Sequence, residues 1–392
     1  MVSIYHSRLN SSAEIIQHYK GDQPLSGWLK AWFSRFKKYG SRDRKEISAL
    51  CYNYYRLGKW HFTSAAGLPE RILTAQLLCG SGPTPLLATL KPTWEPVFTA
   101  TLQQKIQLLH AEGIPFMPAD IFPWRYRLSD GIDADDYARS FLVQPDLFLR
   151  IRPGHAQTVL KQLADAGIPF SELSADAIAL PNTTDIKQVL AVNRQVVVQD
   201  YNSQNISAFL KEIALPSPNT WDCCAASGGK SILATDALKG IKLTVSDIRP
   251  TILANLKKRF AEAGLTRYDV LQLNLEKKPE HVRNAPFDLI ICDAPCTGSG
   301  TWGRTPEQLY FFEDAAIEGF SKLQHNIAGN ALAFLRKGGY FLYITCSVFK
   351  EENEAVVAHL QHHFGLTLLR MECLKGYDKR ADTMFGALLI KR

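Results

Sequence analysis

The chain has 392 residues, a length that predicts two or three domains. Hydrophobic residues make up 46% of it and charged residues 21%, a composition typical of globular proteins that excludes a largely disordered chain. No stretch approaches the roughly 18 apolar residues of a membrane span, and Met1 to Asn10 lack the basic-then-apolar pattern of a secretion signal. We therefore expect a cytoplasmic protein with no membrane partner, and we expect it to be monomeric.

The net charge of +7 is concentrated at the N-terminus. Residues 1–60 carry eleven Lys or Arg and four Asp or Glu, whereas the remaining residues carry 34 of each sign. Aromatic side chains at Trp32, Phe33, Phe36 and Tyr39 alternate with the densest basic cluster, which consists of Arg35, Lys37, Lys38, Arg42, Arg44 and Lys45. Such a local basic field favours binding to a polyanion. The alternative is a solvated helix face whose aromatic side chains pack inward.

The first 140 residues are predicted to form a helical domain. Apolar residues recur at intervals of three or four through residues 28–36 and 47–55, so residues 12 to about 65 are expected to be helical. The segment Gly80-Ser81-Gly82-Pro83 predicts a break. Two further helices are expected at residues 102–111 and 134–143.

The pattern changes at Pro145 and predicts a small α/β module over residues 141–200. Short apolar runs predict strands at residues 147–151, 177–180 and 196–198. Residues 156–166 are expected to form a helix that ends at Gly167.

Residues 201–392 alternate between apolar strands and helices. The predicted strands are residues 242–245, 270–273, 289–292 and 340–344, and the predicted helices are residues 231–238, 250–263, 314–335 and 351–363. Continuous apolar runs are typical of parallel strands buried on both faces. The predicted fold class is therefore α/β, with a doubly wound, Rossmann-like sheet that binds ligands at the carboxyl ends of its strands. Residues 366–369 and 385–390 are expected to add an antiparallel edge.

A glycine-rich segment from Asp222 to Lys230 follows a short strand and opens a helix. Small residues let the backbone approach a ligand closely, and a helix N-terminus offers it free N–H groups. The next strand ends at Asp247, where a carboxylate can bind two ribose hydroxyls. This pattern fits any adenosine-containing cofactor, and the alternative is a tight structural turn. The spacing before the lysine excludes a P-loop.

Two cysteines follow two buried strands. Cys296 lies in the segment Asp293-Ala294-Pro295-Cys296, and Cys346 lies in Thr345-Cys346-Ser347. Both lie beyond the apolar runs, at the strand ends where α/β sheets place their chemistry, whereas a packing cysteine is expected inside a run.

Two cysteines and one aspartate would meet the chemical needs of methyl transfer to carbon 5 of cytosine. A thiolate that adds to carbon 6 makes carbon 5 nucleophilic. A base must then remove the carbon 5 proton so that the thiolate can leave. A carboxyl group near ring nitrogen 3 would stabilise the adduct.

These motifs together resemble the RNA 5-methylcytosine methyltransferases of the Sun/RsmB type. The matching segments, in the family's order, are Gln199 to Gln204, Cys224 to Lys230, Asp293 to Cys296, Thr345 to Ser347 and Glu352-Asn353-Glu354. The resemblance implies S-adenosylmethionine as the cofactor. It also implies Cys346 as the nucleophile and Cys296 as the residue that assists proton removal and product release.

The resemblance assigns further roles around the cofactor. Asp293 would hold the base edge with Lys230 nearby, and Asp247 would bind the cofactor ribose. The expected cofactor contacts are Cys224, Ala225, Ala226, Ser227, Gly228, Gly229, Lys230, Asp247, Asn274 and Asp293. Two of them depart from the family pattern, because Ser227 replaces a proline, which is expected to loosen the loop slightly, and Asn274 replaces an aspartate.

The N-terminal part bears its own resemblance. Residues 41–44 and 50–56 resemble the helical NusB-like extension of the bacterial enzymes that modify small-subunit ribosomal RNA, and residues 145–198 resemble the family's RNA-recognition-like insert. Arg150 or Arg152 would then line an RNA path. The predicted domains are therefore 1–140, 141–200 and 201–392. Ribosomal RNA is the favoured partner, and transfer RNA stays an alternative.

Two other classes of function compete with an active RNA enzyme. A non-catalytic RNA-binding assembly factor is disfavoured because both cysteines and Asp293 are present. A DNA cytosine methyltransferase would leave the Thr345-Cys346-Ser347 loop without a role.

The sequence predicts no metal site. The eight cysteines lack the Cys-x-x-Cys spacing of a structural zinc site. His359, His362 and His363 lie on a predicted helix without a cysteine or carboxylate at ligand spacing. They are expected to form a solvated helix face.

Overall fold

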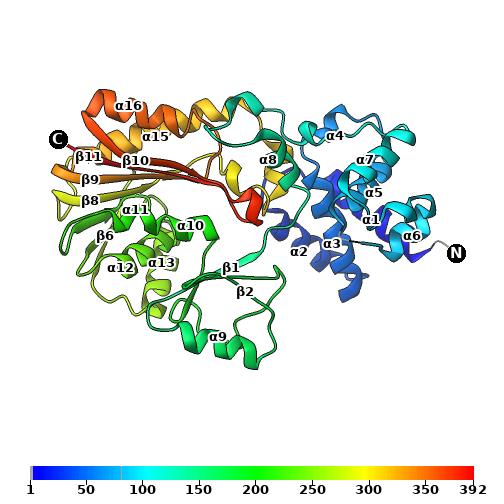
Figure 1. Ribbon diagram of the computed structural model, residues 1–392, viewed down its shortest axis with the longest axis horizontal. Helices are drawn as coiled ribbons and strands as arrows, with labels where there is room; N and C mark the ends of the chain where they lie inside the picture. Colours follow the sequence, from blue (N-terminus) through cyan, green and yellow to red (C-terminus); the bar gives the residue numbers. More distant parts are fainter. Residues whose placement is uncertain (1–2, 81) are drawn as a thin grey trace. The chain divides into compact units, whose positions relative to one another are not determined.

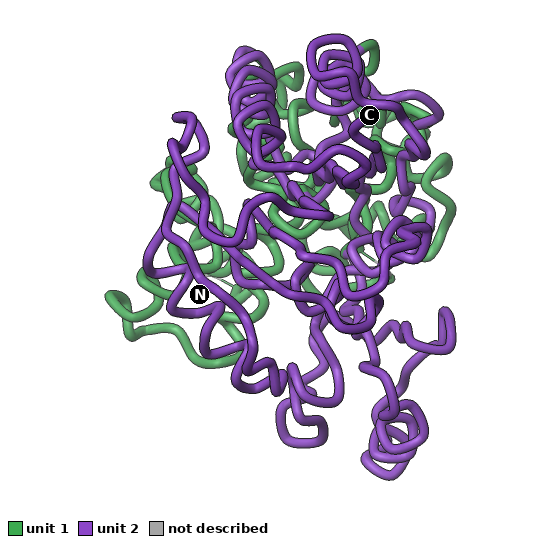
Figure 2. The backbone as a smooth tube through the Cα atoms, turned by 90° about the vertical axis from the view of Figure 1, so that its left-hand side faces the viewer, with its two compact units in different colours: residues 1–126, 133–144, 302–314 green, residues 127–132, 145–301, 315–392 purple. Residues whose placement is uncertain are grey.

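The computed structural model describes residues 3–80 and 82–392, and the chain divides into two compact units (Figure 2). Unit 1 consists of residues up to 126, 133–144 and 302–314, and unit 2 consists of residues 127–132, 145–301 and 315–392. The three predicted domains remain a prediction, since this division groups residues 145–200 with the large sheet. Within the described residues, no helix combines the length and hydropathy needed to cross a bilayer.

Unit 1 is helical, as the apolar spacing predicts. Its α-helices are α1 (Ile4–His18), α2 (Leu25–Arg35), α3 (Ser41–Arg56), α4 (Trp60–Thr63), α5 (Leu68–Cys79), α6 (Pro85–Leu90), α7 (Leu102–Ala111), α8 (Ala134–Ser140) and α14 (Pro306–Phe311), and its 3₁₀ turns include η1 (Pro92–Val97) and η2 (Pro118–Ile121). Helix α1 begins earlier than expected, because the Ser3 side chain accepts a hydrogen bond from the Tyr5 N–H and caps it. Of the predicted break at residues 80–83, Ser81 lies outside the described residues.

A buried arginine joins the separate segments of unit 1. Arg56, at the end of α3, is 1% exposed. Its guanidinium donates to the carbonyl oxygens of Phe141 and Gly303 and to the side-chain oxygen of Gln144. One side chain thus ties residues 302–314 to helix α3, across a sequence separation of 247 residues, because a planar cation with five N–H donors can bind several carbonyls at once.

Unit 2 begins with a small four-stranded sheet in the order β2-β3-β1-β4. Its elements are β1 (Leu147–Ile151), α9 (Ala156–Asp165), β2 (Ser171–Ser174), β3 (Ala177–Leu180) and β4 (Val196–Val198). Apolar side chains of the sheet and of α9 share one core, which includes Leu149, Val159 and Ile178. Strand β2 was not predicted, because all four of its residues are exposed and no apolar alternation marks them.

The larger sheet has seven strands in the order β10-β11-β9-β8-β5-β6-β7. Strands β5 to β9 pair in parallel, and β11 pairs antiparallel with β9 and β10. The predicted antiparallel edge is thus confirmed. The strands are β5 (Asn219–Asp222), β6 (Lys242–Asp247), β7 (Tyr268–Gln272), β8 (Phe287–Asp293), β9 (Leu335–Thr345), β10 (Leu366–Leu374) and β11 (Met384–Lys391).

Helices cover both faces of this sheet (Figure 1). One face packs against α15 (Ala315–Leu332) and α16 (Glu354–Phe364), and the other packs against α11 (Ser207–Lys211), α12 (Gly229–Ala237) and α13 (Pro250–Glu262). The short helix α10 (Tyr201–Asn205) leads into α11. The strand order reverses between β5 and β8, and ligands of open α/β sheets bind at such a switch point. Both predicted motifs begin there, after β5 and after β8.

Candidate functional site

The loop after β5 has the shape of a ligand cradle. Gly228 caps α12 with a φ of 85°, and a Cβ at this position would overlap the ring of Phe260. Only glycine fits both constraints. The loop therefore delivers the free N–H groups of α12 to the open end of the sheet, where they can bind a polar ligand.

Ser227, which replaces the family's proline, is held by a side-chain contact. Its hydroxyl accepts a hydrogen bond of 3.1 Å from Arg259 of α13. Arg259 also donates to the side-chain oxygen of Asn193, which precedes β4. The expected loosening of the loop is therefore countered by a hydrogen bond that proline cannot accept.

Asp247 ends β6 beside the same loop, and its side chain is 6% exposed. Its carboxylate accepts hydrogen bonds from the Ala226 N–H and from the backbone and guanidinium of Arg249. Burial alone would raise the pKa of Asp247, but the contacts with Arg249 lower it overall. The carboxylate is thus ionised and faces the loop. No pattern in the sequence indicates that Arg249 contacts this carboxylate.

Asn274 lies beyond the end of β7 and is exposed. Its side-chain oxygen accepts a hydrogen bond from the Glu276 N–H and closes a short turn. The amide NH₂ is the group left to face a ligand, so this residue would donate where an aspartate would accept.

The two predicted catalytic cysteines meet. Parallel strands β8 and β9 place Asp293 opposite Ile344, so the loops after them lie side by side. The Sγ atoms of Cys296 and Cys346 are 3.4 Å apart, and both residues are half-buried. Gly300 allows the loop after β8 to pass close to Thr383, because a Cβ at position 300 would overlap the backbone carbonyl of Thr383.

The two thiols are not equivalent. The contact with Cys346 raises the pKa of the Cys296 thiol, as do burial and the negative charge of Glu352. A raised pKa keeps the Cys296 thiol in its neutral form, whereas the thiolate is the reactive form of cysteine.

Glu352 holds the two cysteine loops together. This fully buried carboxylate accepts hydrogen bonds from the backbone and hydroxyl of Thr297, from Ser347 at 2.6 Å and from Gln324 of α15 at 2.9 Å. Thr297 follows Cys296 and Ser347 follows Cys346. Burial raises the pKa of Glu352, and its hydrogen bonds oppose that rise.

The two residues after Glu352 hold a segment that was not predicted to belong here. Asn353 donates to the Ser129 hydroxyl and to the Ser347 carbonyl, and Glu354 accepts from Ser129 and from the Asp130 N–H. The motif Glu352-Asn353-Glu354 is thus a structural clamp on the strand ends. The sequence marked the motif but not what it contacts.

Lys230 and Asp293 form an ion pair at the same edge. Their Nζ and Oδ2 atoms are 3.1 Å apart, and the Lys230 side chain is 10% exposed. Lys230 also donates to the Ser203 hydroxyl at 2.8 Å. The ion pair joins the glycine-rich loop after β5 to the loop after β8, and it fixes the direction of the Asp293 carboxylate.

Three further thiols gather under the cofactor loop. The Sγ atoms of Cys223, Cys224 and Cys292 lie within 4.8 Å of one another. Hydrogen bonds with Cys223 and Cys224 lower the pKa of the Cys292 thiol to about 6, whereas burial raises the pKa of Cys223 well above its usual value. The three thiols are therefore electrostatically coupled, and they pack beneath the loop after β5.

The basic residues near the N-terminus lie on the surface of unit 1. All six members of the cluster are exposed, whereas Phe33 and Tyr39 are buried and Trp32 and Phe36 are half-buried. Arg35 and Lys38 lie over the rings of Phe36 and Tyr39. The aromatic side chains thus support the basic surface from below, which leaves the charges available to a polyanion.

Arg150 and Arg152 lie inside unit 2 and not on an open path. Their side chains are 4% and 13% exposed, and both pair with Asp236 of α12. The expectation that either residue lines an RNA path is therefore wrong. Each guanidinium is occupied by a carboxylate encoded more than 80 residues away, which sequence spacing cannot reveal.

Comparison with known proteins gives this arrangement its class. Residues 215–383 match the family described as 16S rRNA methyltransferase RsmB/F. The resemblance to the Sun/RsmB-type RNA methyltransferases found in the sequence is thus confirmed over the residues that carry the glycine-rich loop and the paired thiols. The predicted α/β class with its doubly wound sheet and the predicted cofactor, S-adenosylmethionine, are also confirmed.

Two curated relatives make the similarity more specific. The chain is 26% identical to the ribosomal RNA small subunit methyltransferase B of Xanthomonas campestris, over 89% of both chains. It is 28% identical to the probable ribosomal RNA small subunit methyltransferase B of Bacillus subtilis, over 59% of this chain and 52% of the relative. The chain thus spans about half the length of the Bacillus relative that it matches.

Solved structures share the fold. The crystal structure of PH0851 covers 100% of both chains with a TM-score of 0.72 and 20% identity. A methyltransferase homologue from Pyrococcus horikoshii covers 73% of this chain and 98% of its own, with a TM-score of 0.59 and 21% identity.

Asp222 at the end of β5 generates a prediction for stability. Burial raises the pKa of this carboxyl to about 7, against roughly 3.9 in an unfolded chain. Between these values the folded state binds a proton that the unfolded state lacks, so the stability contribution of Asp222 falls as the pH rises from 4 to 7. We predict that Asp222→Asn gains stability relative to the wild type, by roughly 2 kcal/mol, as the pH rises from 5 to 8.

Urea unfolding of the two proteins at pH 5, 6, 7 and 8 measures this difference. The Ser231 hydroxyl, which donates to Asp222 at 2.5 Å, keeps an acceptor in the asparagine variant. A stability difference that is the same at every pH would show that Asp222 is not protonated in the fold.

Proposed function

We propose that this protein transfers a methyl group to carbon 5 of a cytosine in RNA through a covalent adduct on Cys346. The observation that carries the proposal is the 3.4 Å separation of the Cys296 and Cys346 sulfur atoms at the end of two adjacent parallel strands. A methyltransferase that acts on a nucleophilic nitrogen or oxygen needs no thiol, whereas carbon 5 of cytosine must first be activated by addition at carbon 6.

The roles proposed for the two cysteines follow the family resemblance. Cys346 would add to carbon 6 as the thiolate, while Cys296, whose pKa is raised, would stay protonated during the attack. S-adenosylmethionine supplies the methyl group at carbon 5. Once Cys346 is bonded to carbon 6, its contact no longer opposes ionisation of Cys296, which can lose its proton to solvent and act as the base that removes the carbon 5 proton. The bond between Cys346 and carbon 6 then breaks and releases the product.

The remaining site residues would bind and orient. Asp293, fixed by Lys230, would hydrogen-bond the edge of the cytosine ring and stabilise the adduct. Asp247 would bind the ribose hydroxyls after the Arg249 side chain, which is 58% exposed, has moved aside. Cys224, Ala225, Ala226, Ser227, Gly228 and Gly229 would form the loop around the cofactor, and Asn274 would donate to its adenine side.

Ribosomal RNA is the substrate that we propose, because the curated relatives named above are small-subunit ribosomal RNA methyltransferases. The exposed basic cluster of unit 1 supports a polyanionic partner. The cytoplasmic location and the monomeric state stay predictions, and transfer RNA stays the alternative substrate.

Denaturing gels of cysteine variants test the chemistry. Cys296→Ala should complete attack and methyl transfer and then stall, which leaves methylated RNA bound to Cys346 as a slowly migrating band. Cys346→Ala should form no adduct, since a methyl side chain supplies no thiolate. Both variants should lose turnover.

The double variant Cys296→Ala/Cys346→Ala is the control, and the band must be absent from it. An adduct in Cys346→Ala alone would make Cys296 the nucleophile, as a DNA enzyme uses its proline-cysteine loop. No adduct in any variant, with no methyl transfer by the wild type, would overturn the proposed function.

The basic cluster gives a second prediction. Replacing Arg35, Lys37, Lys38 and Lys45 by Gln should weaken RNA binding and reduce its dependence on salt. Fewer counterions are released on binding when phosphate contacts are lost. Binding measured by filter retention between 50 and 200 mM salt gives the slope. Four exposed lysines of unit 2, Lys187, Lys239, Lys277 and Lys278, serve as the matched control. Equal slopes in the two sets would mean that the cluster has no specific contact with RNA.

A further inference from the structure

A continuous chain of hydrogen bonds runs from the small sheet to Asp293. Arg150 of β1 donates its Nε–H to the Gln199 side-chain oxygen at 2.9 Å, and the Gln199 NH₂ donates to the Ser203 hydroxyl at 3.1 Å. The same hydroxyl accepts from Lys230 at 2.8 Å, and Lys230 pairs with Asp293 at 3.1 Å. None of the roles assigned above uses Arg150, Gln199 or Ser203.

The direction of every bond in this chain is fixed by chemistry. Arginine and lysine only donate, so Gln199 must turn its oxygen towards Arg150 and its NH₂ towards Ser203. Ser203 then accepts from both sides, and both lone pairs of its hydroxyl are occupied. Without the Arg150 donor, the amide of Gln199 can turn over, and Ser203 loses the donor that orients it.

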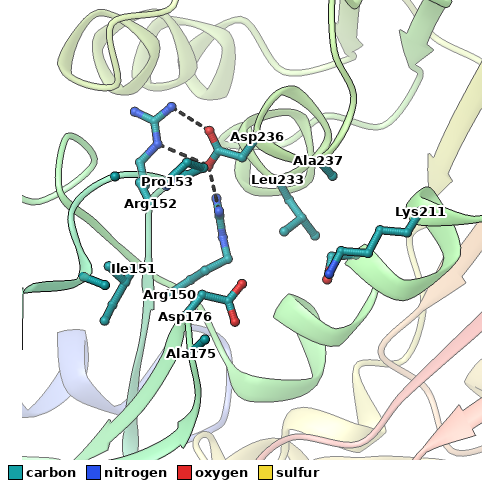
Figure 3. Close-up of a pocket in the computed structure, with 13 residues that line it drawn as sticks. Arg150, Ile151, Arg152, Pro153, Ala175, Asp176, Lys211, Leu233, Asp236 and Ala237 are labelled. Atoms are coloured by element: carbon teal, nitrogen blue, oxygen red, sulfur yellow. Dashed lines mark hydrogen bonds and ion pairs between the residues drawn. The ribbon is translucent and has the colours of Figure 1, made fainter. Parts of the chain in front are cut away.

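Ion pairs hold the Arg150 end of this series of hydrogen bonds in place. Arg150 pairs with Asp236 at 2.7 Å, and Arg152 pairs with the same carboxylate at 2.8 Å (Figure 3). Figure 3 shows the two guanidinium groups meeting Asp236 beside a cavity of about 230 Å³. Asp236 lies near the C-terminal end of α12, and Lys230 lies near its start. The small sheet therefore holds the C-terminal part of α12 through Asp236, while Ser203 and Asp293 hold Lys230 at its start.

We propose that Arg150 and Gln199 are positioning residues, through which the seating of the small sheet on α12 sets the place of the Lys230–Asp293 pair. This inference rests on the proposed function, because it assigns a catalytic task to Asp293. The relay would couple the small module to the cytosine site: a displacement of β1 relative to α12 moves the Ser203 hydroxyl and, with it, the cation that aligns Asp293.

The test compares three variants of the full chain in methyl transfer to a small-subunit ribosomal RNA transcript. Arg150→Met and Gln199→Met remove members of the relay. Arg152→Met is the matched control, because it removes the other arginine on Asp236 and leaves the relay intact. We expect kcat of the two relay variants to fall about tenfold or more, since small misplacements of a catalytic group are costly, while the KM for S-adenosylmethionine changes less than about twofold.

The pH–rate profile separates positioning from simple loss of stability. In the relay variants the Lys230–Asp293 pair loses its fixed geometry, so the shape of the profile should differ from that of the wild type. In Arg152→Met the profile should keep its shape, even if the protein melts at a lower temperature. Ser203→Thr, which keeps the hydroxyl, should retain activity that Ser203→Ala loses.

Gln199→Glu keeps the test sharp if the methionine variants fail to fold. Glutamate at position 199 can still accept from Arg150 but cannot donate to Ser203. We therefore expect kcat to fall even though the buried Arg150 keeps its hydrogen-bond partner. The relay would be overturned if Gln199→Glu and Gln199→Met had the same kcat and the same pH profile as Arg152→Met. If the relay fails this test while the wild type is active and Cys346→Ala is inactive, the proposed function still holds. An inactive wild type would overturn both the relay and the proposed function.

Discussion

In the interior of unit 2, the Glu352 carboxylate accepts hydrogen bonds from the residue after each of the two paired cysteines, and the geometry of the site depends on this contact. Two loops that follow separate strands have no covalent reason to meet. A buried carboxylate with four donors fixes them, because each donor would otherwise lose a hydrogen bond in a place that water does not reach. The negative charge of Glu352 also adds to the rise in the Cys296 pKa that the contact with Cys346 and burial produce.

A second set of charges orders the cofactor side of the sheet. Helix α12 starts at the cofactor loop, carries Lys230 in its first turn and ends beside Asp236. Lys230 reaches Asp293, and Asp236 receives two arginines from the small sheet. The helix is thus held at both ends by ion pairs with low exposure. Buried pairs of this kind are costly to break singly, because the remaining charge stays without a partner, and they fix one arrangement of the elements that bear them.

Most elements of the large sheet could be predicted from the sequence, because buried parallel strands are continuous apolar runs and both motifs sit at their ends. The predicted helix at residues 102–111 has the bounds of α7, and the predicted strand at 147–151 has those of β1. Strands that consist largely of polar or exposed residues could not be predicted, because no apolar pattern marks them. Strand β2 is exposed throughout, and β9 begins at Leu335, five residues before its apolar run, through the polar segment 336–339.

The candidate site shows the same division. The positions of Cys296, Cys346, Asp293, Lys230 and Asp247 could be named because each stands next to a local pattern. The partners of these residues could not, since Arg249 covers Asp247 by a side-chain rotamer and Glu352 acts through residues about 55 positions away. Arg150 shows the risk of local reasoning: a basic residue on a predicted RNA-binding strand looked like a phosphate contact, and it lies buried against Asp236. Sequence spacing identifies which residues reach an edge of the sheet, and long-range ion pairs decide which of them face a ligand.

The rate of disulfide formation between Cys296 and Cys346 tests the central claim most directly, because it measures how often the two sulfur atoms meet. The folded protein is treated with diamide, and the cross-linked peptides are followed by mass spectrometry in the wild type, in Glu352→Ala and in the neighbouring control Glu351→Ala, whose carboxylate pairs with Arg127 instead. The account predicts rapid cross-linking in the wild type and in Glu351→Ala, and a rate lower by about tenfold or more in Glu352→Ala, since the loss of a buried acceptor frees both loops. Equal rates in all three proteins would contradict it.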